Sequence, residues 1–308
     1  MLFLNGDEIN ELISMKDVID AIESHYLDDS DKNEFVPERL FINDNGNTAL
    51  LMPSFYEDYY GAKAIGIAPE NIKINEPTLR GIYYLNKRST MEPLGVFDAR
   101  TITAMRTGAV SGLSIKYLAK KSANKVGIIG TGDQGWSHLQ AACAVRPIEE
   151  VFVYNRSRER LNTFIERIKK QFSHVKVHAT SIEELVEEAD ILCMTTTSKD
   201  PVIPDHIDMT GKHIAASGAF KSFMQEIPDA VIKRADRIFV DSHAAFEESL
   251  DMIKAKQFGK DETKVPEIKE LVRLGENGYK ENQLTIFKSV GMSIFDIITA
   301  KLIYERKQ

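Results

Sequence analysis

Residues 125–135 constrain the fold more than any other part of this sequence. They read KVGIIGTGDQG, a short apolar run that leads directly into Gly-x-Gly-x-x-Gly. In a dinucleotide-binding turn Gly130 permits the tight bend, Gly132 lets the backbone approach a pyrophosphate, and Gly135 lets the helix pack closely on the strand. Residues 136–145 follow with a helical pattern, and the free N–H groups at a helix start bind phosphate. The segment therefore predicts a strand–turn–helix unit that binds a dinucleotide.

Composition excludes several classes of partner and site. The chain has 308 residues, enough for two domains, and a formal net charge of −7, which argues against a nucleic acid or an acidic membrane as partner. No apolar run approaches the ~18 residues of a transmembrane helix, and the N-terminus lacks a signal-peptide pattern. Cys143 and Cys193 are far apart, and the seven histidines form no metal-spaced pair. We expect a cytoplasmic protein with reduced thiols and no metal.

From residue 125 onward, strand and helix patterns alternate, which is typical of a doubly wound parallel sheet. Helices are expected over 158–171 and 181–188, where Ser181-x-x-Glu184 resembles a capping box. The expected strands are 126–129, 151–154, 175–179, 191–195, 213–216 and 237–240. Six strands at this spacing predict a complete Rossmann-type, dinucleotide-binding α/β domain.

The N-terminal region has a different pattern. A helix is expected over 14–26, and short strands over 38–43, 47–52, 61–68, 81–86 and 94–98. This pattern predicts an α+β domain with a mostly antiparallel sheet. A long helix over 100–120 then leads into the nucleotide domain, and 285–304 is expected to form a final amphipathic helix. The expected domains are 1–118 with 289–308, and 119–288.

The dipeptide Asn45-Gly46 indicates a hairpin, because both residues accept the positive φ angles of a type I′ turn. With these two residues at the centre of the turn, Asp44 pairs with Asn47. Counting outward from that pair, Arg39 is expected to lie opposite Met52.

Several motifs occur in a characteristic order along the chain. They are PLGVFDA at 93–99, TAMRTGA at 103–109, IGTGDQ at 129–134, VYNRS at 153–157, TTTS at 195–198 and FKSVG at 287–291. Together they resemble the ornithine cyclodeaminase/mu-crystallin family over nearly the whole chain. The resemblance implies a cytosolic NAD(P)-binding homodimer whose β region forms the substrate pocket and the dimer contact. Family activities include cyclodeamination of ornithine or lysine, oxidation of alanine or arginine, reduction of cyclic ketimines and condensation-type amino-acid dehydrogenation, so the substrate and the direction of reaction stay open.

The resemblance also assigns roles to residues of the N-terminal domain. An amino or imino acid presents a carboxylate, which a guanidinium binds in a bidentate manner. Arg39 and Arg106 occupy the family's carboxylate-binding positions, and Met52 is expected to line the same substrate pocket. Lys63 lies in the apolar run GAKAIGI, where burial and a nearby arginine would lower its pKa into the range of proton transfer. The resemblance places the catalytic lysine here, with Arg106 beside it in the catalytic site.

The cofactor type depends on Asn155-Arg156-Ser157, which follow the second strand of the nucleotide domain. NAD-selective folds usually carry an acidic residue at this point, whereas an arginine accommodates a 2′-phosphate. The sequence therefore favours NADP(H), and NAD(H) stays possible if Arg156 caps a helix or stacks on adenine. Thr196 is expected beside the nicotinamide ribose. The full set of expected cofactor contacts is Arg106, Thr107, Gly130, Gly132, Asp133, Gln134, Gly135, Asn155, Arg156, Ser157, Thr196, Gly218, Ala219, Val290 and Gly291.

One departure from the family pattern bears on the reaction. Many members carry an aspartate soon after the fifth strand, but here Phe220 or Phe223 stands where that carboxylate is expected. Its absence disfavours cyclodeamination of ornithine and favours simple hydride transfer. The sequence thus predicts an NAD(P)-dependent oxidoreductase that acts on a small amino or imino acid, of the cyclic ketimine reductase or amino-acid dehydrogenase type. The alternatives are an ornithine or lysine cyclodeaminase, and an NADPH-dependent binding protein for a small ligand, with the two phenylalanines lining its site.

Overall fold

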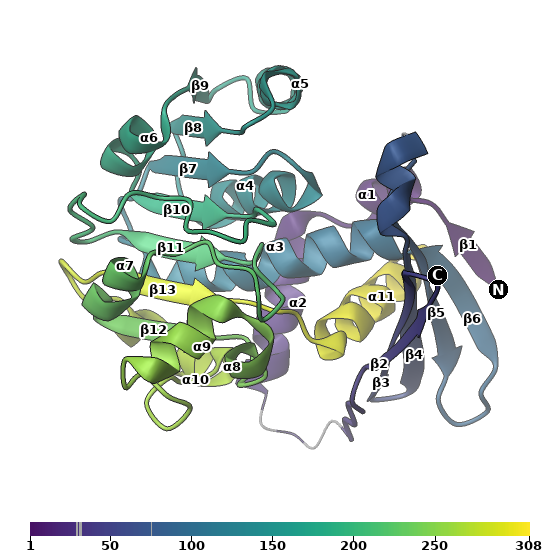
Figure 1. Ribbon diagram of the computed structural model, residues 1–308. Helices are drawn as coiled ribbons and strands as arrows, with labels where there is room; N and C mark the ends of the chain where they lie inside the picture. The colour runs from purple at the N-terminus through teal and green to yellow at the C-terminus, as the bar shows by residue number, and fades with distance from the viewer. Residues whose placement is uncertain (29, 31–32, 75) are drawn as a thin grey trace. The chain divides into compact units, whose positions relative to one another are not determined.

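The structure divides into two units. The computed structural model describes residues 1–28, 30, 33–74 and 76–308 (Figure 1). Unit 1 comprises Met1–Arg106 and Met292–Gln308, and unit 2 comprises Thr107–Gly291. The sequence placed the two limits after residues 118 and 288. In the structure the first limit lies inside one continuous helix, α3 (Ala99–Leu118), which no local sequence signal subdivides.

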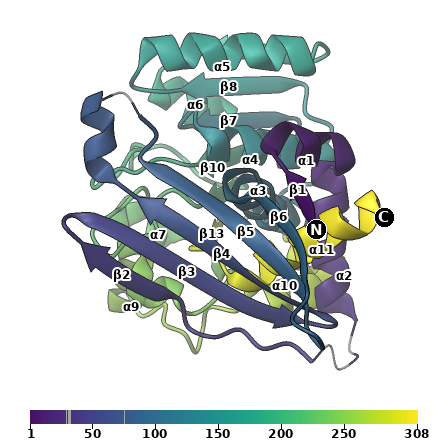
Figure 2. The same ribbon diagram turned by 90° about the vertical axis from the view of Figure 1, so that its right-hand side faces the viewer.

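Unit 1 is built on a six-stranded sheet in the order β1-β6-β5-β4-β3-β2. Only β1 and β6 pair in parallel, and the other neighbours are antiparallel, as expected. The strands are β1 (Leu2–Leu4), β2 (Leu40–Asp44), β3 (Asn47–Tyr56), β4 (Tyr59–Ile67), β5 (Leu79–Lys87) and β6 (Pro93–Asp98). In Figure 2 these strands lie side by side, with β2 at one edge.

The hairpin between β2 and β3 has the predicted turn. Asn45 and Gly46 adopt φ angles of 48° and 82°, and Asp44 pairs with Asn47. The register of β2 and β3 agrees with the count that places Arg39 opposite Met52, since Leu40 pairs with Leu51. Strand β2 begins at Leu40, however, so Arg39 lies one residue before the strand.

The helices of unit 1 are α1 (Gly6–Leu12), α2 (Met15–Leu27), the start of α3 and α11 (Ser293–Lys307), with a 3₁₀ turn at η1 (Pro69–Ile74). Ser14 and Asp17 form a capping box that starts α2. Helix α11 packs against β3 and β4 and lies behind the sheet in Figure 2. The prediction of one helix over 285–304 is wrong: residues 285–288 form a buried strand, and Gly291, with a φ of 88°, lies in the turn before α11. A short apolar run reads equally well as buried strand or helix.

Unit 2 contains a seven-stranded parallel sheet in the order β12-β13-β11-β10-β7-β8-β9. The strands are β7 (Lys125–Ile129), β8 (Glu150–Tyr154), β9 (Lys176–Ala179), β10 (Ile191–Met194), β11 (His213–Ala216), β12 (Arg237–Val240) and β13 (Thr285–Lys288). All six predicted strands are present, and β13 is an additional strand between β11 and β12. The chain runs outward in opposite directions from β7 and β10, which makes this pair the switch point of the sheet.

Helices cover both faces of this sheet, as the doubly wound prediction requires. They are α4 (Asp133–Val145), α5 (Arg158–Gln171), α6 (Ile182–Glu188), α7 (Asp229–Arg234), α8 (Ala245–Glu248), α9 (Leu250–Gln257) and α10 (Ile268–Leu274), followed by a 3₁₀ turn, η2 (Gly275–Gly278). One core joins Val126 and Ile128 to Trp136 of α4 and Phe164 of α5. A second core joins Ile129 and other strand residues to α6, α7 and α9.

Some classes of site are missing from the part of the chain that the structure describes. There, no helix combines the length and the apolarity needed to cross a membrane. Nor do three or more His, Cys, Asp or Glu side chains gather there in a group suited to a metal ion. Cys143 and Cys193 are free thiols, and burial raises the pKa of both, so neither is a reactive thiolate at neutral pH.

Candidate active site

A row of buried side chains crosses the sheet of unit 1. Met52 of β3 pairs with Lys63 of β4, and Lys63 pairs in turn with Tyr83 of β5. Directly opposed residues in an antiparallel sheet project from the same face. All three side chains are buried, with Lys63 only 1% exposed. The register therefore places a lysine ammonium between apolar and aromatic neighbours, on a sheet that α11 packs against.

The partner of Lys63 is Asp296 of α11, a residue that the sequence analysis did not identify. Its two carboxylate oxygens lie 3.0 Å and 2.8 Å from the Lys63 Nζ atom. The Arg106 Nε atom donates to Oδ1 of the same carboxylate at 3.1 Å. Asp296 is fully buried, so one carboxylate serves two buried cations. The sequence feature that could have identified Asp296 is its position as a single acidic residue within the apolar stretch Ser-Ile-Phe-Asp-Ile-Ile at 293–298.

The surroundings of Lys63 bring its pKa closer to neutral pH. Burial lowers the pKa of Lys63 to about 8, and the Arg106 and Arg39 guanidinium groups also lower it, whereas Asp296 opposes them. A lysine with a pKa in this range exchanges its proton far more readily at neutral pH than an ordinary surface lysine does.

The structure thus brings together the expected residues of unit 1. The Arg106 Nε–H group donates to Asp296. Its two Nη groups have no side-chain hydrogen-bond partner among the described residues. They offer a fork for a bound carboxylate. Arg39 lies in the segment before β2, is partly exposed and acts electrostatically on Lys63. That these side chains and Met52 bind a substrate stays a prediction.

The expected cofactor residues of unit 2 follow the carboxyl ends of its parallel strands, here called the carboxyl edge. The strand ends are aligned, because a single row of paired residues crosses the sheet: Tyr154, Ile129, Met194, Ala216 and Lys288. The segments that leave these ends contain Asn155–Ser157, Gly130–Gly135, Thr196, Gly218–Ala219 and Val290–Gly291. Open α/β sheets bind their ligands along this edge.

The glycine turn fits a dinucleotide. Gly130 has a φ of +102°, and a Cβ atom at Gly135 would lie 2.0 Å from the Gly130 carbonyl oxygen. Both positions therefore require glycine. At Gly132 a Cβ atom would meet open space, which leaves room for a pyrophosphate beside the backbone. The Thr131 Oγ1 atom in this turn is buried and has no hydrogen-bond partner among the described residues.

The loop after β8 uses two of its three polar residues internally. The Asn155 amide donates to the Ser157 carbonyl oxygen at 3.0 Å. The Ser157 hydroxyl accepts from the Arg160 backbone N–H at 3.4 Å and so caps α5. Arg156 is the exposed member of the three. A 2′-phosphate at this loop would therefore meet mainly the Arg156 guanidinium.

The segment after β11 carries no carboxylate at its first positions. Phe220 and Phe223 are both largely exposed, and the Lys221 ammonium lies within 6.0 Å of both ring centroids. Glu226, which the sequence analysis overlooked, points back to the strand end and accepts from the Gly218 and Ala219 N–H groups. These hydrogen bonds occupy its carboxylate, which is therefore unsuited to act as a free base.

Two other buried groups fix neighbouring segments of the carboxyl edge. The Asp241 carboxylate accepts from the Ser289 hydroxyl and from the Val290 and Gly291 N–H groups, at 2.6–3.0 Å from its Oδ2 atom. His138 donates from Nδ1 to the Gln134 carbonyl oxygen, so its Nε2 atom accepts from two serine hydroxyls. Burial lowers the pKa of His138 to about 4, which keeps this ring neutral.

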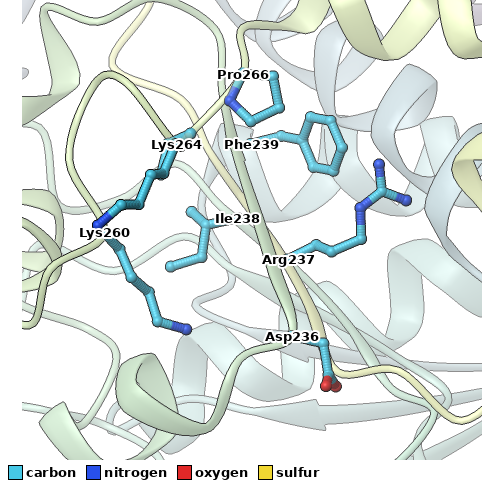
Figure 3. Close-up of a pocket in the computed structure, with 8 residues that line it drawn as sticks. Asp236, Arg237, Ile238, Phe239, Lys260, Lys264 and Pro266 are labelled. Atoms are coloured by element: carbon cyan, nitrogen blue, oxygen red, sulfur yellow. The ribbon is translucent and has the colours of Figure 1, made fainter.

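A cavity of about 410 Å³ beside β12 lies away from this edge (Figure 3). Its lining includes Asp236 and Arg237, which lie at the amino end of the strand. The Lys264 ammonium donates to the Gly259 carbonyl oxygen at 2.7 Å, and the Lys260 ammonium donates to the Ala235 carbonyl oxygen. Both ammonium groups are thus bound by backbone carbonyl oxygens. The cavity also lies at the amino end of β12, whereas parallel sheets bind dinucleotides at the carboxyl ends of their strands, so it is not the dinucleotide site.

The comparisons with known proteins agree with this geometry. Residues 1–308 match the model of the ornithine cyclodeaminase/mu-crystallin family. The protein belongs to this family. The chain is 37% identical to a Δ1-pyrroline-2-carboxylate reductase of Bacillus cereus over 99% of this chain and 96% of the relative.

Two solved structures are also similar over nearly the whole chain. One is the Thermococcus litoralis Δ1-pyrroline-2-carboxylate reductase in complex with NADH and L-proline, with a TM-score of 0.90, 35% identity and coverage of 99% of this chain and 97% of that chain. The other is an archaeal alanine dehydrogenase dimer with bound NAD, with a TM-score of 0.88, 28% identity and coverage of 99% and 95%.

Replacing Asp296 should destabilise the protein, because Asp296→Asn leaves two buried cations without their counter-charge. Loss of one partner from a buried ion pair costs about 3–5 kcal/mol. We expect a decrease of this size in the free energy of unfolding at pH 7, measured by urea denaturation. The decrease should become smaller above pH 8, where Lys63 loses its proton.

Lys63→Met is the matched control for this measurement. It leaves Asp296 paired with Arg106, so its cost in stability should be much smaller than that of Asp296→Asn. Equal unfolding free energies for the Asp296→Asn variant and the unmodified protein would contradict the ion-pair assignment.

Proposed function

We propose that this protein is an NAD(P)-dependent reductase of cyclic imino acids, with Δ1-pyrroline-2-carboxylate as its substrate and L-proline as the product. The observation that carries the proposal is the arrangement of Lys63 and Arg106 on one buried carboxylate, which combines a proton donor with a guanidinium fork. The relatives with the same reaction support it, because they are 37% and 35% identical to this chain over 99% of its length.

The chemistry of the substrate suits these groups. The Arg106 Nη groups, together with Arg39, hold the substrate carboxylate. The Lys63 ammonium donates a proton to the imine nitrogen, which makes the carbon of the C=N bond electrophilic. A reduced nicotinamide, when bound, supplies the hydride that this carbon accepts. The C=N bond becomes a CH–NH bond, and Lys63, now neutral, takes up a proton while Asp296 keeps it in position.

Unit 2 supplies the residues that hold the cofactor in this proposal. The Gly130–Gly135 turn and the first N–H groups of α4 bind the pyrophosphate, with Thr131 as a further donor. Asn155–Ser157 lie at the adenosine ribose. Thr196, Gly218 and Ala219 hold the nicotinamide riboside, and Thr107 and Val290–Gly291 complete the set.

Turnover of a substrate panel tests the proposed function. Purified protein with NADH or NADPH should oxidise the cofactor fastest with Δ1-pyrroline-2-carboxylate, and more slowly with pyruvate plus ammonia, because a linear imine must form first. The absorbance of the reduced nicotinamide reports each rate. Release of ammonia from ornithine or lysine without net change in nicotinamide would instead identify a cyclodeaminase, and binding without any turnover would identify a ligand-binding protein.

The pH dependence should follow Lys63. Reduction needs the protonated ammonium, so kcat/KM should be constant below and fall above a pH of about 8. Oxidation of L-proline needs the neutral amine, so its kcat/KM should rise towards the same pH. Lys63→Met should lower turnover by about 10²–10⁴-fold, the usual contribution of a general acid, and should leave NADH binding unchanged. Normal turnover by this variant would exclude the mechanism.

We further propose that Arg156 gives NADP(H) an advantage over NAD(H). Support comes from the exposed guanidinium at the end of β8 and from the absence of an acidic residue there. Two relatives of known structure carry NADH or NAD, so support for the advantage comes from this loop and not from those relatives.

Titration of both cofactors measures that advantage. One charge-assisted contact should favour NADPH by about 10-fold at low salt, and the ratio should shrink as salt screens the exposed site. Arg156→Ala should weaken NADPH much more than NADH, whereas Arg273→Ala, at an exposed arginine of α10, should change neither. Equal affinities for the two cofactors in the unmodified protein would remove the role of Arg156.

A second copy of this chain is the partner that we propose for the β2 edge. Leu40, Phe41 and Ile42 are 49–54% exposed on consecutive positions of this edge strand, so both of its faces are apolar. Such an edge is a site of association, and the archaeal alanine dehydrogenase is a dimer. Light scattering should give twice the mass of one chain, and Phe41→Glu should shift the protein towards monomer. A monomeric unmodified protein would contradict the proposal.

A further inference from the structure

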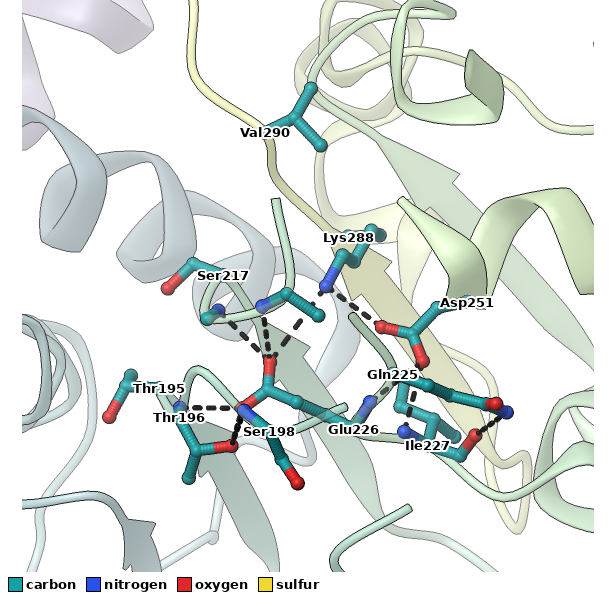
Figure 4. Close-up of polar contacts among 12 residues, drawn as sticks. Thr195, Thr196, Ser198, Ser217, Gln225, Glu226, Ile227, Asp251, Lys288 and Val290 are labelled. Carbon is teal, nitrogen blue, oxygen red and sulfur yellow. Dashed lines mark hydrogen bonds and ion pairs between the residues drawn. The ribbon is translucent and has the colours of Figure 1, made fainter. Parts of the chain in front are cut away.

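A buried carboxylate ties together two strand ends in unit 2 (Figure 4). Glu226 is fully buried. Its Oε1 atom accepts from the Thr196 N–H at 2.6 Å and from the Thr196 hydroxyl at 2.9 Å, beyond the end of β10. Its Oε2 atom accepts from the Gly218 and Ala219 N–H groups at 3.0 Å and 2.9 Å, beyond the end of β11. One side chain therefore fixes the separation of two segments of the carboxyl edge.

Asp251 and Lys288 fix the position of Glu226 itself. The Asp251 carboxylate accepts from the Glu226 and Ile227 N–H groups at 3.1 Å and 3.0 Å. Lys288, which ends β13 and is fully buried, donates to Asp251 at 2.9 Å, and its Nζ atom lies 3.8 Å from Glu226 Oε2. The strand β13 thus supplies one cation that the two acids share.

The separation that Glu226 sets is narrow. A Cβ atom at Gly218 would lie 2.1 Å from the Thr196 carbonyl oxygen and 2.6 Å from Glu226 Oε1. The segments after β10 and β11 therefore approach as closely as glycine permits. Every partner of the two Glu226 oxygens is a donor, so the ionised form fits this site and a neutral amide does not.

The strand order tells which half of a dinucleotide these segments serve. The order reverses between β7 and β10, so β8 and β9 lie on the adenosine side and β10 and β11 on the nicotinamide side. Glu226 contacts only the second pair. We propose that Glu226 is a positioning residue for the binding site of the nicotinamide riboside. It holds Thr196, Gly218 and Ala219 in place and does not contact the cofactor itself.

This inference rests on the proposed function of unit 2 as the dinucleotide domain, and it makes a selective prediction. Glu226→Gln keeps the shape of the side chain and leaves Lys288 paired with Asp251. The amide NH₂ group, however, then faces hydrogen-bond donors, either those of Thr196 or those of Gly218 and Ala219. NADH carries the nicotinamide riboside and ADP lacks it. The variant should bind NADH about 10-fold more weakly, since a buried donor loses its partner, and should bind ADP unchanged. Its kcat at saturating NADH should also fall.

Asp190→Asn is the matched control. Asp190 also accepts from two backbone N–H groups, those of Asn124 and Lys125, and it pairs with Lys120 at 2.6 Å, but it lies beside the amino end of β7. The control should bind NADH and ADP as the unmodified protein does. If Glu226→Gln does not fold, Asp251→Asn is the alternative variant. It removes the ion pair between Lys288 and Asp251, so the Lys288 ammonium can move towards Glu226 and displace it. This variant should also weaken the binding of NADH and leave that of ADP unchanged.

Titration of NADH by fluorescence and of ADP by calorimetry separates the outcomes. A selective loss of NADH in Glu226→Gln or Asp251→Asn, absent in Asp190→Asn, supports the inference. Equal losses of NADH and ADP, no loss of NADH, or the same selective loss in the control overturns it. Failure of the unmodified protein to bind either ligand would instead overturn the proposed function.

Discussion

The Asp296 carboxylate, buried between Lys63 and Arg106, is the interaction on which the proposed chemistry depends. It joins three segments of unit 1 that lie far apart in the sequence, namely β4, the start of α3 and α11. Removing three charged groups from water costs much free energy, which only close pairing recovers. Hydrophobic residues of similar shape would pack there at lower cost. The charges are therefore best explained by their function.

The balance of charge gives this site its chemical character. One carboxylate faces two buried cations, with Arg39 as a third positive group nearby. In the proposed function, the excess positive charge attracts an anionic substrate. Burial and this positive charge lower the pKa of Lys63, whereas Asp296 raises it. A substrate carboxylate would complete the neutralisation. In the proposed function, substrate binding and proton transfer thus depend on the same imbalance of charge.

Much of the fold could be predicted from local sequence. The glycine turn, the Asn45-Gly46 hairpin and the alternating strands of unit 2 each follow from short patterns with a clear physical basis. Lys63 was recognisable because a lysine is unexpected in an apolar strand. Lys288 carries the same signal in Thr-Ile-Phe-Lys, but the prediction of a helix over 285–304 obscures it, because residues 285–288 form a strand.

The groups that escaped prediction act through long-range contacts. Asp296 meets Lys63 across 233 positions of the chain, and Glu226 meets Thr196 across 30. Each is a single acidic residue whose partner no spacing rule reveals. The boundary between the units was also hidden, because α3 continues through it as one helix of 20 residues.

Direct titration of Lys63 tests the central claim, that burial, Asp296 and the arginines together set its protonation. Lysine labelled with carbon-13 at Cε reports the pKa of each side chain by nuclear magnetic resonance, and Lys63→Met assigns the signal. We expect a pKa of about 8 in the unmodified protein, and a lower value in Asp296→Asn, where the carboxylate no longer counteracts burial and the arginines. An ordinary pKa of about 10.4 in the unmodified protein, or no decrease in the variant, would contradict the account.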